Sequence, residues 1–183
     1  MGLVARRAGG AWALCACALL VHDARSAESL SEYGIKAAYL YYFATFVEWP
    51  AAPSTVGTPF VVGVLGEDPF GPVLEETLRG KAVGDRPFVV RRLRRAKDAR
   101  ECAILFVSPA EGERLEAILE DLAGAPVLTV GDTARFVQRG GHVGLWMEGK
   151  KVRFEIGLAA VERSGLKVSS QLLKLAAPAP VGG

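Results

Sequence analysis

The chain has 183 residues, half of them hydrophobic, and a formal net charge of +2 at pH 7. The excess charge lies near the start, because without Arg6, Arg7, Asp23 and Arg25 the chain keeps 19 basic and 19 acidic residues. A near-neutral protein has no overall basic field to attract nucleic acid, which excludes that class of partner. The remainder is long enough for one domain with a hydrophobic core.

The first 26 residues have the pattern of an export signal. Arg6 and Arg7 supply positive charge, Ala11–Val21 is an uninterrupted apolar run, and Ala24–Ser26 includes small residues suited to cleavage. The 11 residues of the apolar run are too few to span a bilayer, which needs about 20. We therefore expect a signal peptide over residues 1–26 and a soluble periplasmic protein. A lipoprotein signal at Leu14–Cys17 is the alternative, disfavoured because the apolar run continues past the cysteines.

The segment Lys36–Pro50 has the densest aromatic content of the chain, with all four tyrosines in it or just before it. A helical period gathers five large side chains on one face: Ile35, Tyr39, Tyr42, Phe46 and Trp49. Because proline cannot continue a helix, we expect the helix to end at Pro50. We expect the face that holds Tyr39, Tyr42 and Phe46 to pack against the rest of the domain.

The opposite face of this helix carries a smaller apolar stripe. A helix that is apolar nearly all round is normally buried on both sides. We therefore predict that residues of this second face bind another copy of the chain or a signalling partner: Ala37, Tyr41, Ala44 and Glu48. Tyr41 is the expected anchor, since tyrosine offers contact area at low entropic cost. The alternative is that Leu166–Leu175 of the same chain covers this face.

After a linker over residues 51–59, apolar strands alternate with helices. Near-continuous apolar runs predict four strands: Phe60–Leu65, Pro87–Leu93, Cys102–Val107 and Pro126–Val130. Capping signals predict three helices: one from Asp68 to about Arg79, one over Ala110–Leu122, and a short one from Asp132 to Gly140-Gly141. Apolar strands separated by helices indicate a parallel sheet that is covered on both faces.

The chain ends differently, because two segments of alternating polarity flank the turn signal Glu148-Gly149. His142–Met147 and Lys150–Ile156 therefore predict an antiparallel hairpin with one solvent-exposed face. A helical region over Leu158–Leu175 and a frayed tail over Ala176–Gly183 follow. The predicted fold is α/β with three layers: a mostly parallel sheet, helices on both faces and a C-terminal antiparallel hairpin. It forms a single domain over residues 27–175.

Polar residues follow the carboxyl ends of three predicted parallel strands: Glu67, Asp68, Ser108, Asp132 and Thr133. Ligands bind at this edge of open α/β sheets, and helix N-termini there favour anions. We therefore predict a ligand crevice lined by these five residues. Helix capping alone is the simpler alternative, because it accounts for every one of them.

Other chemistry-bearing residues favour structural roles. Cys102 stands alone after the signal and opens an apolar strand, so we interpret it as a buried residue, with an intermolecular disulfide as the alternative. His142 starts a glycine-rich strand, where a structural role is favoured. Metal-ligand spacings, a nucleophile elbow and a phosphate loop are missing from the sequence, so we predict no cofactor, no metal and no enzymatic activity.

A run of basic residues begins at the end of the second predicted strand and continues toward the third: Arg91, Arg92, Arg94, Arg95, Lys97 and Arg100. A solvated loop is the simplest interpretation. An anionic membrane surface or an acidic partner is the alternative.

The aromatic segment and several later phrases together resemble the YfiR family of exported bacterial proteins. The matching phrases span nearly the whole mature chain: Lys36–Pro50, Val62–Gly71, Cys102–Ser108, Val127–Thr133, Gly140-Gly141, Val152–Ile156 and Ser169–Leu173. The resemblance implies an α/β periplasmic protein, often a homodimer, whose best-understood member represses an inner-membrane diguanylate cyclase. Two departures are that Gly157 stands where the family commonly has Asn, and that Cys102 alone cannot form the disulfides of some members.

The resemblance leads us to expect a non-enzymatic periplasmic regulator. It would bind the periplasmic domain of an inner-membrane signalling protein such as a diguanylate cyclase, and so affect cyclic di-GMP and biofilm formation. A periplasmic small-ligand-binding protein that serves a transporter or receptor is the alternative.

Overall fold

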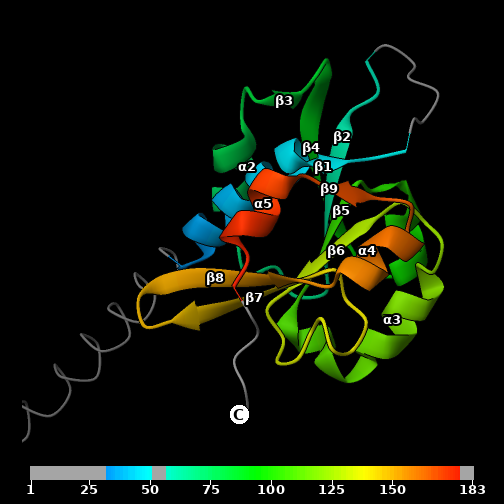
Figure 1. Cartoon of the computed structure of the whole chain (residues 1–183). Coiled ribbons are helices and arrows are strands. Elements are labelled where there is room, and N and C mark those ends of the chain that lie inside the picture. Colours follow the sequence, from blue (N-terminus) through cyan, green and yellow to red (C-terminus); the bar gives the residue numbers. More distant parts are fainter. Residues whose placement is uncertain (1–31, 51–56, 178–183) are drawn as a thin grey trace, which may run out of the picture.

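The computed structural model describes residues 32–50 and 57–177 (Figure 1). The predicted signal peptide, most of the linker and residues 178–183 of the predicted tail lie outside these ranges. Within them, a seven-stranded sheet runs through the molecule in the order β3-β4-β2-β5-β6-β7-β8. The strands are β2 (Phe60–Leu65), β3 (Ala82–Val83), β4 (Arg86–Leu93), β5 (Ile104–Val107), β6 (Leu128–Gly131), β7 (Val143–Glu148) and β8 (Lys151–Ile156).

The centre of the sheet is parallel and its two margins are antiparallel. Strand β2 pairs in parallel with β4 and β5, and the parallel order continues through β6 to β7. The hairpin β7–β8 is antiparallel, with Glu148 opposite Lys151, and β3 is antiparallel to β4. The predicted mostly parallel sheet with a C-terminal hairpin is therefore confirmed.

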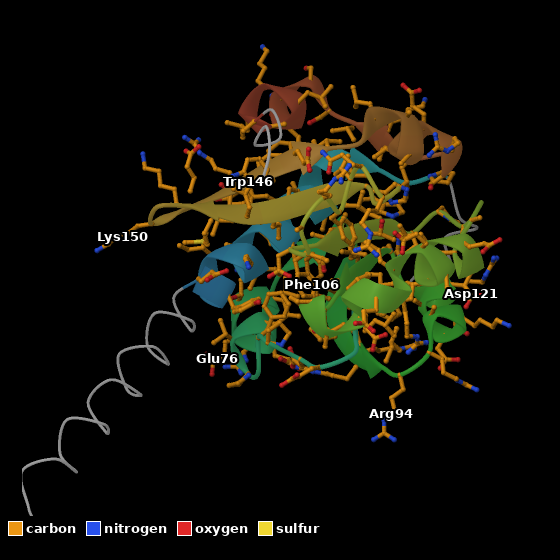
Figure 2. All side chains as sticks on the ribbon, turned by 90° about the horizontal axis from the view of Figure 1, so that it is seen from below. Glu76, Arg94, Phe106, Asp121, Trp146 and Lys150 are labelled. Atoms are coloured by element: carbon orange, nitrogen blue, oxygen red, sulfur yellow. The ribbon has the colours of Figure 1, made fainter. Side chains whose placement is uncertain are left out.

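The central strands are apolar on both sides because both faces of the sheet are covered. All six residues of β2 are buried, as are all four of β5 and of β6. Gly63 has no space for a side chain, since a Cβ there would lie 2.9 Å from the Cys102 sulfur. Figure 2 shows Phe106 of β5 within this interior, whereas Arg94, Asp121 and Lys150 project outward.

Two apolar clusters form the layers of the core. One face of the sheet packs under the aromatic helix (residues 32–46), α2 (Val73–Leu78), α4 (Leu158–Arg163) and α5 (Ser170–Leu175). The other face packs under the 3-10 helix η1 (Ala96–Glu101) and the helix α3 (Leu115–Asp121). The 3-10 helix η2 (Pro109–Arg114) leads into α3. The predicted three-layer α/β class is confirmed.

The aromatic helix is rotated relative to the prediction. Ile35 and Tyr42, assigned to the inner face, are 41% and 51% exposed, whereas Ala37 and Ala44, assigned to the partner-binding face, are fully buried. The prediction placed the largest side chains on the buried face. The helix instead buries the stripe that holds its small residues, because alanines permit close packing and tyrosines can keep their hydroxyl groups in water. Ala37 and Ala44 are therefore excluded as surface residues for a partner.

The aromatic helix also ends earlier than predicted, at residue 46. Val47 and Glu48 form the short strand β1, which pairs antiparallel with β9 (Lys167–Val168). The Ser169 N–H donates to the Phe46 carbonyl at 3.0 Å, and Leu166 and Leu172 belong to the same buried cluster as Ala37 and Ala44. This arrangement agrees with the alternative interpretation, in which the C-terminal segment packs on the helix.

Two further segments differ from the prediction. Residues after Asp132 form turns instead of a short helix. The Phe136 ring of this segment lies so close to Gly131 and Gly141 that a Cβ at either would fall within 2.3 Å of it. The predicted tail begins too early, since the Ala177 N–H donates to the Phe154 carbonyl at 2.9 Å.

Candidate functional site

The carboxyl ends of the central strands bring three loops together, as the sequence predicts. Ser108 follows β5 and donates its N–H to the Leu65 carbonyl at the end of β2, at 3.0 Å. The Glu111 side chain lies against Gly66, where a Cβ would approach it to 2.7 Å, and Thr133 lies against Gly112 in the same way at 3.2 Å. The loop after β5 therefore contacts the loops after β2 and β6.

Two of the five predicted crevice residues have local roles, and a third is exposed. The Asp68 carboxylate accepts the Phe70 N–H at 2.8 Å and binds the Arg92 guanidinium at 2.8 and 2.9 Å. The Ser108 hydroxyl accepts the Ala110 N–H and caps η2. Glu67 is exposed. The capping alternative accounts for Ser108, and a turn with a surface ion pair accounts for Asp68.

Asp132 turns away from these residues and lies beneath the aromatic helix. Its Oδ2 accepts hydrogen bonds from the Tyr33 hydroxyl at 2.9 Å and from Lys36 Nζ at 2.5 Å. Lys36 Nζ also lies 2.5 Å from Glu32 Oε1 and 4.4 Å from the centre of the Tyr33 ring. The Lys36 and Asp132 side chains are only 3% and 5% exposed. We call Glu32, Tyr33, Lys36 and Asp132 the Lys36–Asp132 cluster.

This cluster joins the start of the aromatic helix to the loop after β6. Burial, followed by the Asp132 carboxylate, raises the pKa of Tyr33 far above its ordinary value. The hydroxyl therefore remains protonated and donates to Asp132, so Tyr33 cannot serve as a general base. The arrangement is a buried, hydrogen-bonded ion pair that links two distant parts of the chain.

Sequence reasoning included Asp132 but missed Tyr33 and Lys36. A usable signal exists, because Lys36 falls at helical spacing with Leu40 and Phe43 in the stripe that is buried. A lysine in such a stripe requires a buried acidic partner. Asp132, placed directly after the buried strand β6, meets that requirement.

Two polar atoms, one in this cluster and one next to it, have no hydrogen-bond partner within the described residues. They are Asp132 Oδ1 and Thr133 Oγ1, both buried. Most buried polar atoms in proteins are paired, so these two stand out. Together they are one acceptor and one hydroxyl that can donate or accept.

His142 and Cys102 are buried in settings that hold them in neutral form. Burial lowers the pKa of His142 to about 4, and its Nδ1 accepts the Thr129 N–H at 2.9 Å while Nε2 lies 2.9 Å from the Ser164 hydroxyl. Burial raises the pKa of the Cys102 thiol to about 11. A protonated thiol is a poor nucleophile. The described residues contain no group of three or more His, Cys, Asp or Glu side chains that could hold a metal.

Comparison with protein families gives a match that covers almost all of the described residues. The model of the family described as YfiR/HmsC-like matches residues 33–177, from Tyr33 of the Lys36–Asp132 cluster to the last described residue. The chain belongs to the YfiR/HmsC-like family. The resemblance found in the sequence is thereby confirmed.

The YfiR/HmsC-like family is known for periplasmic regulation of cyclic di-GMP signalling, a regulatory rather than catalytic role. Across the residues that the structure describes, none of the helices has both the length and the apolar character needed to cross a membrane.

Gly157, one of the two departures noted in the sequence, is tightly packed in this YfiR/HmsC-like chain. A Cβ there would lie 2.9 Å from both the Gly141 carbonyl oxygen and a Val137 methyl group. The Gly157 N–H donates to the His142 carbonyl at 2.8 Å. Two backbone segments therefore approach closely at Gly157.

Proposed function

We propose that this protein is an exported, non-enzymatic regulator that binds the periplasmic part of a membrane-bound diguanylate cyclase and represses it. Lower cyclic di-GMP and weaker biofilm formation follow from that repression. The observation that carries the proposal is the YfiR/HmsC-like match, which covers residues 33–177.

The proposal is tested in the source organism by deletion and capture. Deleting the gene should raise cyclic di-GMP, and a plasmid copy should restore the original level. A tagged copy recovered from solubilised membranes should carry a diguanylate cyclase with it. Unchanged cyclic di-GMP in the deletion strain, with a transporter or outer-membrane receptor as the captured protein, would contradict repression of a cyclase.

A second candidate function is the binding of a small polar ligand, and one observation favours it. Asp132 Oδ1 and Thr133 Oγ1 are buried and unpaired within the described residues. Replacing Thr133 with valine removes the hydroxyl at nearly constant volume. If a ligand binds there, a panel of small polar metabolites should include one that raises the melting temperature of the wild type and not of Thr133→Val. Equal shifts in both proteins would leave Thr133 with a structural role only.

A further inference from the structure

The outer edge of β4 presents unpaired backbone groups. The Leu93 carbonyl accepts the N–H of Gly66, the residue that follows β2. The backbone polar groups of Leu93 therefore point toward β2. Because successive residues of a strand face opposite sides, Val90 and Arg92 direct their N–H and C=O groups outward. Strand β3 covers this edge only at its beginning, where it pairs with Arg86 and Pro87 and where the Phe88 N–H reaches the Lys81 carbonyl at 3.5 Å. Among the described residues no backbone group pairs with the outward side of Val90 or Arg92.

At the opposite edge of the sheet, strand β8 has outward backbone carbonyls that are hydrogen-bonded. On β8, the Phe154 carbonyl accepts the Ala177 N–H at 2.9 Å, and the Val152 carbonyl accepts the Tyr39 hydroxyl at 3.4 Å. Outward carbonyls of β8 are thus satisfied by the chain itself. Exposed sheet edges are templates for another strand, and proteins usually cover or blunt them. Among the described residues, the β4 edge beyond Phe88 has no such backbone cover and remains accessible to an added strand.

A hollow of about 470 Å³ lies beside this edge, between the end of α2 and β4. Its walls include Leu78, Phe88 and Val90, which are apolar, and Arg79 and Lys81, which are basic and exposed. Lys81 Nζ stands 4.9 Å from the centre of the Tyr41 ring, which itself contacts Phe88. An apolar pocket next to a free strand edge is the arrangement in which added strands gain specificity from alternate side chains.

The charge around the edge favours an acidic occupant over a second copy of the chain. Residues 75–101 contain nine basic and five acidic residues, whereas the other described residues contain 10 basic and 13 acidic. Arg91, Arg92 and Arg95 have acidic partners. Arg79, Arg94 and Lys97 have none among the described residues. Two copies joined edge to edge would bring two net-positive segments together, and like charges across paired strands are unfavourable.

We propose that the β4 edge binds an extended, acidic segment of a protein partner as an added strand. The segment would pair with the backbone of Val90 and Arg92 and place one apolar side chain in the hollow. Acidic side chains would lie against Arg79 and Lys81. The proposal deepens the proposed function and rests on it in one respect, namely that the segment would belong to the membrane protein.

The test uses the exported chain and a displayed library of random ten-residue peptides. Peptides selected on the wild type should alternate apolar and acidic residues and should bind more weakly as salt rises. Val90→Pro removes an outward N–H and keeps the ladder with β2, while Val90→Ala is the matched control that keeps the N–H. Val90→Pro should weaken peptide binding by about tenfold or more, because main-chain hydrogen bonds are lost, and Val90→Ala should weaken it far less.

A second variant protects the test against misfolding. Arg79→Glu/Lys81→Glu changes exposed side chains only and should abolish the preference for acidic peptides. Selected peptides that lack acidic residues and bind Val90→Pro as well as wild type would overturn the proposal. So would wild-type self-association that Val90→Pro abolishes, because the occupant would then be a second copy.

The same variants separate this inference from the proposed function. If Val90→Pro and Arg79→Glu/Lys81→Glu fold and still repress the cyclase, the β4 edge is not the partner's surface and the proposed function stands. If peptides bind the edge but gene deletion leaves cyclic di-GMP unchanged, the edge stands and the proposed function fails.

Discussion

Replacing Asp132 tests the role of the Lys36–Asp132 cluster. If Asp132 only capped a helix, as one interpretation of the sequence held, its loss would cost about 1 kcal/mol. In the structure, Asp132→Asn instead removes the charge that faces Lys36 Nζ at 2.5 Å, with both side chains at least 95% buried. Breaking a buried ion pair by removing one partner costs about 3–5 kcal/mol, because the other charge stays buried.

Two features of the cluster reduce that figure. Glu32 Oε1 also lies 2.5 Å from Lys36 Nζ, and its side chain is 27% exposed, so part of the pairing survives. The substitution also converts the unpaired Oδ1 of a carboxylate into part of a neutral amide, which is cheaper to bury. We therefore expect Asp132→Asn to lower the free energy of unfolding by about 2–3 kcal/mol.

The assay is urea unfolding followed by circular dichroism, run as a double-mutant cycle with Lys36→Met. Methionine keeps most of the lysine side-chain volume without its charge. In the Lys36→Met background the Asp132→Asn change should cost less than about 1 kcal/mol, because no buried ammonium is left unpaired. Equal costs in the two backgrounds, or a single-mutant cost under about 0.5 kcal/mol, would refute the assignment of a buried ion pair.

The remaining predictions concern the core and pH. Phe43→Ala should lower the free energy of unfolding by about 3–5 kcal/mol, and more than Phe46→Ala, because Phe43 is fully buried and Phe46 only partly; equal losses in urea melts would contradict the helix rotation. The His142 pKa is lowered to about 4, so the unfolded chain binds the proton first, and stability should fall by roughly 3 kcal/mol as pH drops from 7 to 4. In His142→Asn, which keeps an acceptor near Nδ1, that fall should be smaller by about this amount; parallel pH profiles would exclude His142 as the cause. Gly157→Ala should cost about 1–3 kcal/mol because its Cβ would meet the Gly141 carbonyl at 2.9 Å, and an unchanged melting temperature would show that the two segments separate easily.

Strand positions were predictable from the sequence because burial on both faces leaves a continuous apolar run. Phe60–Leu65 was predicted with its observed bounds, and the strands β4 to β8 differ from prediction by one or two residues at their ends. The strands β1, β3 and β9 were missed. Each has two residues and is defined by its partner alone, so no local pattern marks it.

The face of the aromatic helix was not predictable from residue size. Tyr42 is large and apolar in part, yet it lies 51% exposed, while Ala37 is fully buried. What decides the face is the tertiary environment: Lys36 must reach Asp132, which is 96 residues away in the chain. The size of the side chains contains no information about such a distant charge, whereas the position of Lys36 in the stripe with Leu40 and Phe43 does. For the same reason, the sequence placed Asp132 in a crevice with Asp68 rather than beneath the helix.

The pairing of β1 with β9 has a consequence for how the protein is made. Val47 pairs with Val168, so 120 residues separate the two halves of this contact. During synthesis the aromatic helix leaves the ribosome early, and its closing strand leaves nearly last. The apolar face of the helix must therefore wait for almost the whole domain, and loops of this length close slowly. A chain that terminates before residue 167 would contain every strand of the main sheet but would lack β9, the partner of β1 at the end of the aromatic helix. Such fragments would expose apolar surface and become targets for chaperones and proteases.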